Sequence, residues 1–133
     1  MNVRRIRELA DVIEEHPEWF RMEYWAFGRD GSLISDTSAI ASELDHCGTS
    51  GCIAGLAVWM FSRTRGARTG WRGVIDAAVK LLGLTDGSAS ILFLSNKWPY
   101  PYCERFNDAD TQSAKAAVAV RLLRDLADGK VAL

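Results

Sequence analysis

The stretch from residue 50 to residue 62 constrains the fold most, because it is apolar on nearly every side of a helix. Thr49 or Ser50 is suited to begin this helix, since either side chain can accept a hydrogen bond from the first turn. The apolar residues then continue to Phe61. A helix without a polar face is buried at the centre of its domain. The sequence therefore predicts a central buried helix over 50–62.

A cysteine motif precedes and opens this helix, and we interpret it as mainly structural. Gly51 and Gly55 lie four residues apart. Each glycine costs a helix about 1 kcal/mol relative to alanine, so the pair needs a packing reason. We expect both to let another backbone approach closely. Cys52 lies beside apolar residues and is predicted to be a small buried hydrophobic residue, while Cys47 fills space under the preceding loop.

Helical periodicity predicts further helices on both sides of the central one. The first runs from Val3 to His16, with Asn2 as its N-cap. Three later helices each have a terminal signal: residues 74–82 before Gly83, residues 86–93 after the cap Thr85, and residues 111–128 before Gly129.

Two segments between the helices are predicted to differ from them. Residues 20–35 alternate in polarity and contain an Asp-Gly pair, which predicts a small β-hairpin. Residues 95–110 contain two prolines and are predicted to form an ordered, irregular loop. Three aromatic residues of this loop are expected to seal the core or to form a second contact patch: Trp98, Tyr100 and Tyr102.

The composition is typical of one globular domain in the cytoplasm. Of the 133 residues, 48% are apolar and 25% are charged, which suffices to bury a core. No apolar stretch approaches the roughly 20 residues of a spanning helix, and the first residues do not resemble a secretory signal. Three cysteines fit reduced cytosolic thiols. We predict a mainly α fold: a single compact domain, residues 1–133, of about five helices.

The net charge of −1 hides an uneven distribution along the chain. Residues 1–50 carry five basic and ten acidic side chains (−5), and residues 51–133 carry eleven basic and seven acidic ones (+4). Local charge of this kind marks a contact surface. Within ten residues the chain holds a cluster that we name the arginine segment and predict to bind a partner: Arg63, Arg65, Arg68 and Arg72, with Trp71. A solvated loop and internal pairing with the acidic first half remain alternatives.

A thiol enzyme is the alternative function that the cysteine motif suggests. Cys47 precedes the predicted helix, where unpaired backbone N–H groups and the helix dipole lower a thiol pKa. His46 lies beside it, and His16 is the other histidine of the chain. The sequence argues against a papain-like site, because neither histidine follows the cysteines and the spacing from Cys47 to Cys52 is two residues too long. A different Cys-His pair remains open.

Metal binding and DNA reading are weakly indicated. The cysteines Cys47, Cys52 and Cys103 lack the second closely spaced ligand pair of a structural zinc site, so we predict no metal and no cofactor. Residues 78–92 resemble a helix-turn-helix, but the second helix offers no Arg, Lys, Asn or Gln to contact base edges. We interpret this segment as an ordinary helical corner.

Residues 47–57, CGTSGCIAGLA, resemble a known motif. It is Cys-Gly-Thr, two variable residues, then Cys-Ile/Val-Ala-Gly and usually Trp-Ala, and it marks a family of small uncharacterised proteins of phages, plasmids and bacteria. Here Leu56 replaces the usual tryptophan. The resemblance implies an intracellular protein of a mobile element and implies no activity.

Two function classes therefore stay open. The first is a non-enzymatic binding protein that engages a host or defence-system protein, or an acidic or nucleic-acid surface, through the arginine segment. In the phage context such binding fits host takeover or counter-defence. The second is a thiol-dependent enzyme that uses Cys47 with His46 or His16.

Overall fold

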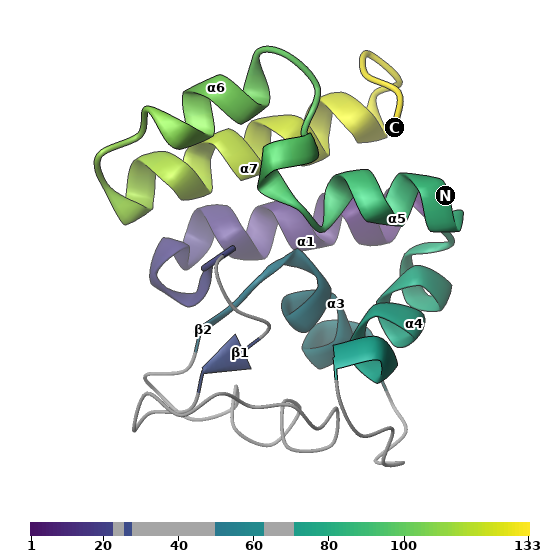
Figure 1. The fold of residues 1–133 in the computed structure, drawn as a ribbon. Coiled ribbons are helices and arrows are strands. Elements are labelled where there is room, and N and C mark those ends of the chain that lie inside the picture. Colours follow the sequence, from purple (N-terminus) through teal and green to yellow (C-terminus); the bar gives the residue numbers. More distant parts are fainter. Residues whose placement is uncertain (23–25, 28–49, 63–70) are drawn as a thin grey trace.

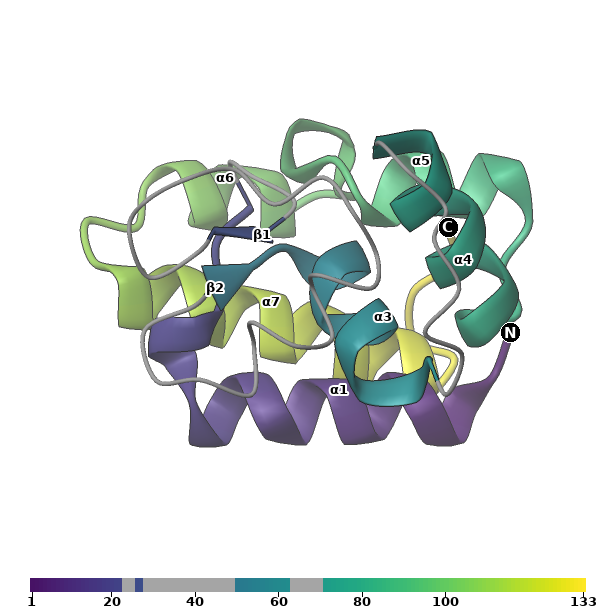
Figure 2. The same cartoon turned by 90° about the horizontal axis from the view of Figure 1, so that it is seen from below.

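Two long antiparallel helices lie side by side along the middle of the molecule. The computed structural model describes residues 1–22, 26–27, 50–62 and 71–133. Helix α1 (Val3–Glu15) packs against α7 (Gln112–Ala127), which brings the first and last helices together. The two chain ends consequently lie on the same side of the molecule in both ribbon views (Figures 1 and 2).

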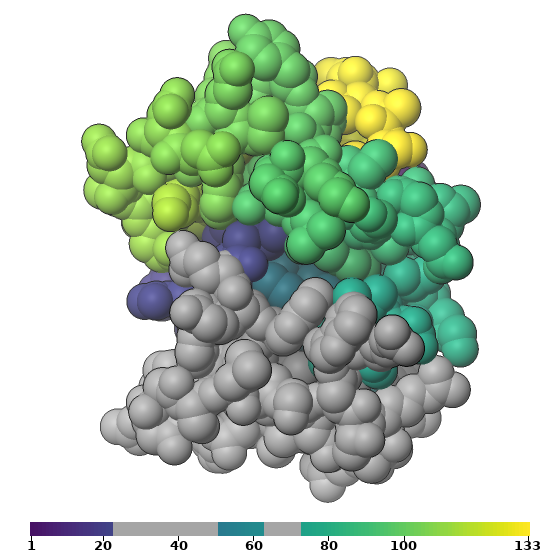
Figure 3. All heavy atoms as spheres, viewed as in Figure 1, coloured from purple at the N-terminus to yellow at the C-terminus, as the bar shows by residue number. Residues whose placement is uncertain are grey.

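The other helices pack on either side of this pair. Figure 1 shows α6 beyond α7, and α3 with α4 on the far side of α1. In the space-filling view, the green atoms of α5 and of the segment up to α6 cover much of the upper face (Figure 3). The bounds of these elements are α3 (Ile53–Phe61), α4 (Trp71–Leu82), α5 (Asp86–Leu92) and α6 (Tyr102–Asn107). The predicted mainly α fold is confirmed.

Helix α1 forms as the sequence predicts. The Asn2 side chain accepts a hydrogen bond from the backbone N–H of Arg5 and so caps the first turn. The apolar residues of the helix recur at helical spacing, and four of them are fully buried: Ile6, Leu9, Ala10 and Ile13. The helix ends at His16, because Pro17 starts a 3-10 turn, η1 (Pro17–Trp19).

Helix α3 is buried as predicted, but its predicted start is wrong. It begins at Ile53 with Cys52 in the N-cap position, so neither Thr49 nor Ser50 caps it. Ser50 instead belongs to a short strand, β2 (Ser50–Gly51), and the Gly51 carbonyl accepts a hydrogen bond from the Arg21 N–H at 2.9 Å. This pairing keeps the backbone extended, so the helix starts later. The fully buried side chains of Ile53, Leu56 and Val58 each contribute about 1.5–3 kcal/mol.

The strand β2 pairs antiparallel with β1 (Ala26–Phe27). The predicted hairpin over 20–35 lies mostly outside the described residues. Within the described ranges, the strand at 26–27 pairs with residues 50–51, far along the chain. The predicted turn at Asp30-Gly31 lies outside the described residues.

Helix α4 ends as predicted, and residues near the start of the chain donate hydrogen bonds to its last carbonyl groups. Gly83 adopts a φ of 62°, its N–H donates to the Lys80 carbonyl, and the Leu84 N–H donates to the Val79 carbonyl. The last carbonyls of the helix accept from residues of α1's first turn: the Asn2 N–H reaches Leu82 and the Arg5 guanidinium reaches Leu81, both at 2.7 Å. Thr85 caps α5 through the N–H of Ser88, also as predicted.

The prediction that residues 95–110 form only an irregular loop is wrong. They contain a 3-10 turn, η2 (Ser95–Lys97), and the six-residue helix α6. Burial of Tyr102 and Phe106, one turn apart, holds this short helix on α7. Trp98 is also buried, and its indole N–H donates to the Leu92 carbonyl at 2.9 Å. Trp98 and Tyr102 therefore seal the core, whereas Tyr100 is 77% exposed.

The final helix matches its prediction at both ends. Thr111 caps α7 by accepting from the Ala114 N–H, and Gly129 ends it with a φ of 71°. Over the described residues, none of the helices is both long and apolar enough to span a membrane.

Candidate functional site

The described part of the cysteine motif lies inside the protein. Gly51 and Gly55 are buried, and Cys52 is 2% exposed at the start of α3. Burial raises the pKa of the Cys52 thiol to about 11, against the weaker effect of the backbone N–H groups around it. The predicted burial of Cys52 is therefore confirmed, and its thiol stays protonated at neutral pH. The motif residues Cys47 and Thr49 lie outside the described residues.

The candidate catalytic residues are only partly described. His46 and Cys47 fall outside the described residues. The His16 ring stacks on Trp19 with centroids 3.8 Å apart, and its Nδ1 lies 3.3 Å from a carboxylate oxygen of Glu18. His16 thus has structural partners at the end of α1. The described cysteines Cys52 and Cys103 are free thiols, and the described residues contain no cluster of three potential metal ligands.

The arginine segment joins α3 to α4, and its two ends are described. Ser62 ends α3, and Trp71 and Arg72 form the first turn of α4. Arg63, Arg65 and Arg68 lie outside the described residues. Because α3 packs against α4, the described residues on either side of the segment belong to neighbouring helices.

A surface hollow lies between α1 and α3. Its lining residues on α3 directly precede the arginine segment in the sequence. It has a volume of about 720 Å³. The side of α1 that faces it is charged, and the side of α3 is aromatic and apolar. The residues that line it are Arg4, Arg5, Glu8, Asp11, Val12, Trp59, Met60 and Phe61. We name this feature the α1–α3 hollow.

The two arginines of the α1–α3 hollow have different surroundings. The Arg5 side chain reaches from α1 to α4 and α3. Its guanidinium donates to the Leu81 carbonyl of α4 and lies 5.2 Å from the centre of the Phe61 ring of α3. Arg4 is 86% exposed, and its Nε donates to Glu8 at 2.7 Å. This bond and the charge of Glu8 raise the pKa of Arg4, which is a cation at every physiological pH.

Aromatic side chains adjoin the hollow. Trp59 and Trp19 make an edge-to-face contact with ring centroids 5.4 Å apart, and the His16 ring stacks on Trp19. All three are half-buried. These ring contacts link the end of α1 to α3, and aromatic pairs of this kind contribute about 0.5–1.5 kcal/mol beyond their buried area.

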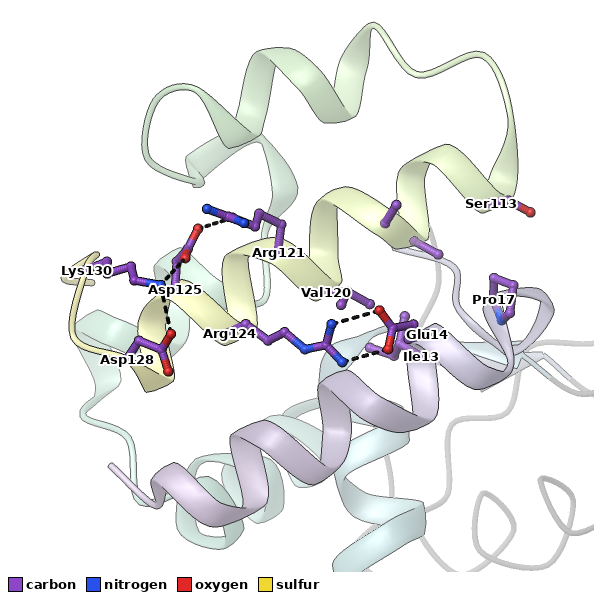
Figure 4. A pocket seen from close by; sticks show the side chains of 12 residues that line it. Ile13, Glu14, Pro17, Ser113, Val120, Arg121, Arg124, Asp125, Asp128 and Lys130 are labelled. Carbon is purple, nitrogen blue, oxygen red and sulfur yellow. Dashed lines mark hydrogen bonds and ion pairs between the residues drawn. The ribbon is translucent and has the colours of Figure 1, made fainter.

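A second groove, of about 500 Å³, runs over α7 beside α1 (Figure 4). Arg124 forms a fork-shaped pair with Glu14, both bonds at 2.7 Å, and also reaches Asp11 at 3.0 Å. A second ion pair has its cation on α1 instead of α7: Arg7 pairs with Asp128, the C-cap residue of α7, at 3.0 Å. These pairs join the first and last helices. The internal pairing considered for the arginine segment is a separate alternative, and Arg63, Arg65 and Arg68 lie outside the described residues.

The other end of this groove is a network around Asp125. This carboxylate is 5% exposed and accepts from Tyr102 and from Arg121, each at 2.6 Å, and from Lys130 at 3.4 Å. The hydrogen bond from Tyr102, followed by those from the two cations, lowers the pKa of Asp125. Figure 4 shows Arg121 and Lys130 converging on it. The charges of this groove are largely matched within the protein, so we interpret it as structural.

A third hollow, of about 340 Å³, lies between α4 and α5 and is almost entirely apolar. Its walls include Ile75, Val79, Phe93 and the 41% exposed Leu94.

The α1–α3 hollow was not predicted from the sequence. Arg4, Glu8 and Asp11 follow helical spacing, which marks a polar face of α1 but not what lies opposite. Helix α3 is apolar on every side, so periodicity does not show which of its residues reach the surface.

Comparison with known proteins gave no match. No protein-family model matches the chain, and no curated protein or solved structure is similar to it.

Proposed function

We propose that this protein is a non-enzymatic binding protein that engages an acidic face of another protein through the α1–α3 hollow and the arginine segment. The observation that carries the proposal is the composition of the hollow. It unites arginine, tryptophan, methionine and phenylalanine on one surface. These residue types are enriched at the centres of protein interfaces, and tryptophan and arginine dominate their binding energy.

The charges around this surface favour an acidic partner. Within the hollow, Glu8 is paired with Arg4, and Asp11 is paired with Arg124 of α7. The chain then continues from Ser62 into Arg63, Arg65 and Arg68, and reaches Arg72 at the start of α4. The excess of guanidinium groups along residues 63–72 of the sequence suits carboxylates, with which arginine forms paired hydrogen bonds.

The motif at residues 47–57 gives the biological setting of the proposal. Its resemblance to phage and plasmid proteins supports a cytoplasmic accessory protein of a mobile element. Its partner is a host or defence-system protein, and binding serves host takeover or counter-defence.

The proposal is tested by capturing partners in a bacterial host and then measuring the affinity of each purified partner. The variant replaces Arg63, Arg65, Arg68 and Arg72 by alanine. The control replaces three exposed cations elsewhere: Lys80, Lys97 and Arg105.

We expect the arginine-segment variant to bind the partner at least about tenfold more weakly, because charged interface residues steer and hold an oppositely charged partner. The control variant keeps the wild-type affinity. Equal loss in both variants, or no loss in either, contradicts the proposal.

A further inference from the structure

The floor of the α1–α3 hollow is apolar, while its rim on α1 is charged. Val12, Trp59, Met60 and Phe61 are half-buried and form the apolar part. Methionine is flexible and adapts to side chains of different shape. A volume of about 720 Å³ is large enough to accommodate a bulky side chain of a partner.

The rim presents Arg4 to solvent. Its Nε is bonded to Glu8, while the side chain as a whole is 86% exposed. A guanidinium group has five N–H donors, so Arg4 can bind a further carboxylate without leaving Glu8. Arg5 lies deeper and is held by the Leu81 carbonyl and the Phe61 ring. The free cationic capacity of the rim therefore lies at Arg4.

The aromatic rings near the hollow are engaged within the protein. The Arg5 guanidinium lies over the Phe61 ring, and Trp59 packs edge-to-face with Trp19. Single-stranded nucleic acids bind by stacking bases on open aromatic faces. The remaining lining, Val12 and Met60, suits an aliphatic or aromatic side chain of a protein. These contacts favour a peptide segment over a nucleic acid.

We infer that the α1–α3 hollow receives a bulky apolar side chain from an acidic amphipathic helix of the partner, and that Arg4 binds a carboxylate beside it. This inference rests on the proposed function and specifies the partner's contact segment. Amphipathic helices dock in grooves through apolar residues at positions such as i, i+3, i+4 and i+7. Glutamates on the flanks of such a helix match the charge of Arg4.

The probe is a fluorescein-labelled helical peptide of about 15 residues, with leucine at every third or fourth position and glutamate between. One control peptide replaces the glutamates by lysine, and another replaces the leucines by alanine. A single-stranded RNA of uridines is the third control. Fluorescence anisotropy gives the affinity, and methyl NMR of the full chain locates the peptide.

We expect only the acidic leucine peptide to bind, with shifts of the Met60 and Val12 methyl signals. Arg4→Glu is expected to weaken binding at least about fivefold, because it reverses the charge of the rim. The matched variant Arg105→Glu changes an exposed arginine on α6 and leaves the affinity unchanged.

Three results overturn the inference. They are absence of acidic-peptide binding, methyl shifts confined to the α4–α5 hollow, and tighter binding of the RNA than of the peptide. If the captured partner still depends on the arginine segment but is insensitive to Arg4→Glu, the inference fails and the proposed function stands. If neither change affects the captured partner, both fail.

Discussion

Among the described residues, Asp125 is the one charged side chain that is buried, and its hydrogen bonds explain how it is tolerated. A buried carboxylate without partners costs several kcal/mol, so its donors must be complete. Tyr102 brings a donor from α6, Arg121 one from the preceding turn of α7, and Lys130 one from the turn after it. One carboxylate thereby ties three segments together.

Tyr102→Phe removes the hydroxyl that donates a 2.6 Å hydrogen bond to Asp125, and it leaves the aromatic ring in place. We expect a loss of about 1.5–3 kcal/mol in the free energy of unfolding, as for other hydrogen bonds to charged groups. The matched control is Tyr100→Phe, because Tyr100 is exposed and the same atom is removed. Chemical denaturation of the three proteins measures the difference, and equal stability of both variants contradicts the role of the network.

The same network predicts how stability depends on acid. The pKa of Asp125 is lowered in the folded state, first by Tyr102 and then by the cations. A lowered folded pKa stabilises the protein above the unfolded pKa of about 4, and this stability is lost as the pH falls through the folded value. We expect the denaturant concentration at the unfolding midpoint of the wild type to decrease as the pH drops below about 4. The same decrease should be smaller in Asp125→Asn. An identical pH profile for the two proteins contradicts this account.

The cysteines are predicted to differ in alkylation. Cys52 has a pKa of about 11 and is buried, so iodoacetamide should leave it unmodified in the folded protein at neutral pH. Cys103 is half-buried and should react. As part of a binding protein, Cys47 should be half-reacted near about pH 8.5, the value of an ordinary thiol. Mass spectrometry of the peptides measures each site, and a midpoint near about pH 6 at Cys47 supports the thiol enzyme instead.

At the scale of elements, helix ends are the features that local sequence predicts best. Asn2 and Thr85 each supply the predicted cap, and Gly83 and Gly129 follow their helices as predicted, both in the left-handed conformation. These outcomes depend on hydrogen bonds between residues at most five apart in the chain, so the sequence contains the whole signal.

The elements that were mispredicted depend on distant partners. Helix α3 starts at Ile53 because residues 50–51 pair with strand β1 and with Arg21. Helix α6 has only six residues and is stabilised by burying Tyr102 and Phe106 against other helices. So short a helix has no stability by itself, and periodicity over one turn cannot identify it.

The central helix gives a prediction about glycine. Gly55 is buried in α3, whereas Gly87 lies exposed in α5 with only the Thr85 hydroxyl within 4 Å of an added Cβ. Gly55→Leu should cost about 1–3 kcal/mol or more through overpacking. Gly87→Leu should be neutral or stabilising by a few tenths to about 1 kcal/mol, since it replaces a helical glycine. Melting temperatures measure both, and an unchanged value for Gly55→Leu contradicts close packing at that position.

At the scale of the whole molecule, the acidic first half and the basic second half of the chain form ion pairs with each other. Arg124 of α7 pairs with Asp11 and Glu14 of α1. We propose that the arginine segment binds a partner instead. The clustering of four arginines within ten residues can be read from the sequence alone. The α1–α3 hollow cannot be predicted from the sequence, because it joins residues 4–12 to residues 59–61, and only the packing of α1 on α3 brings them together.

The central claim is that the arginine segment attracts an acidic partner, and the association rate constant tests it most directly. Stopped-flow measurements with the captured partner compare the wild type with the variant that lacks Arg63, Arg65, Arg68 and Arg72. Salt screens exposed charges, with a Debye length that falls from about 10 Å at 0.1 M to about 3 Å at 1 M ionic strength. The wild-type rate should fall steeply with salt, and the variant's rate should be slower and nearly independent of it. Equal rates with equal salt dependence in the two proteins would contradict the account.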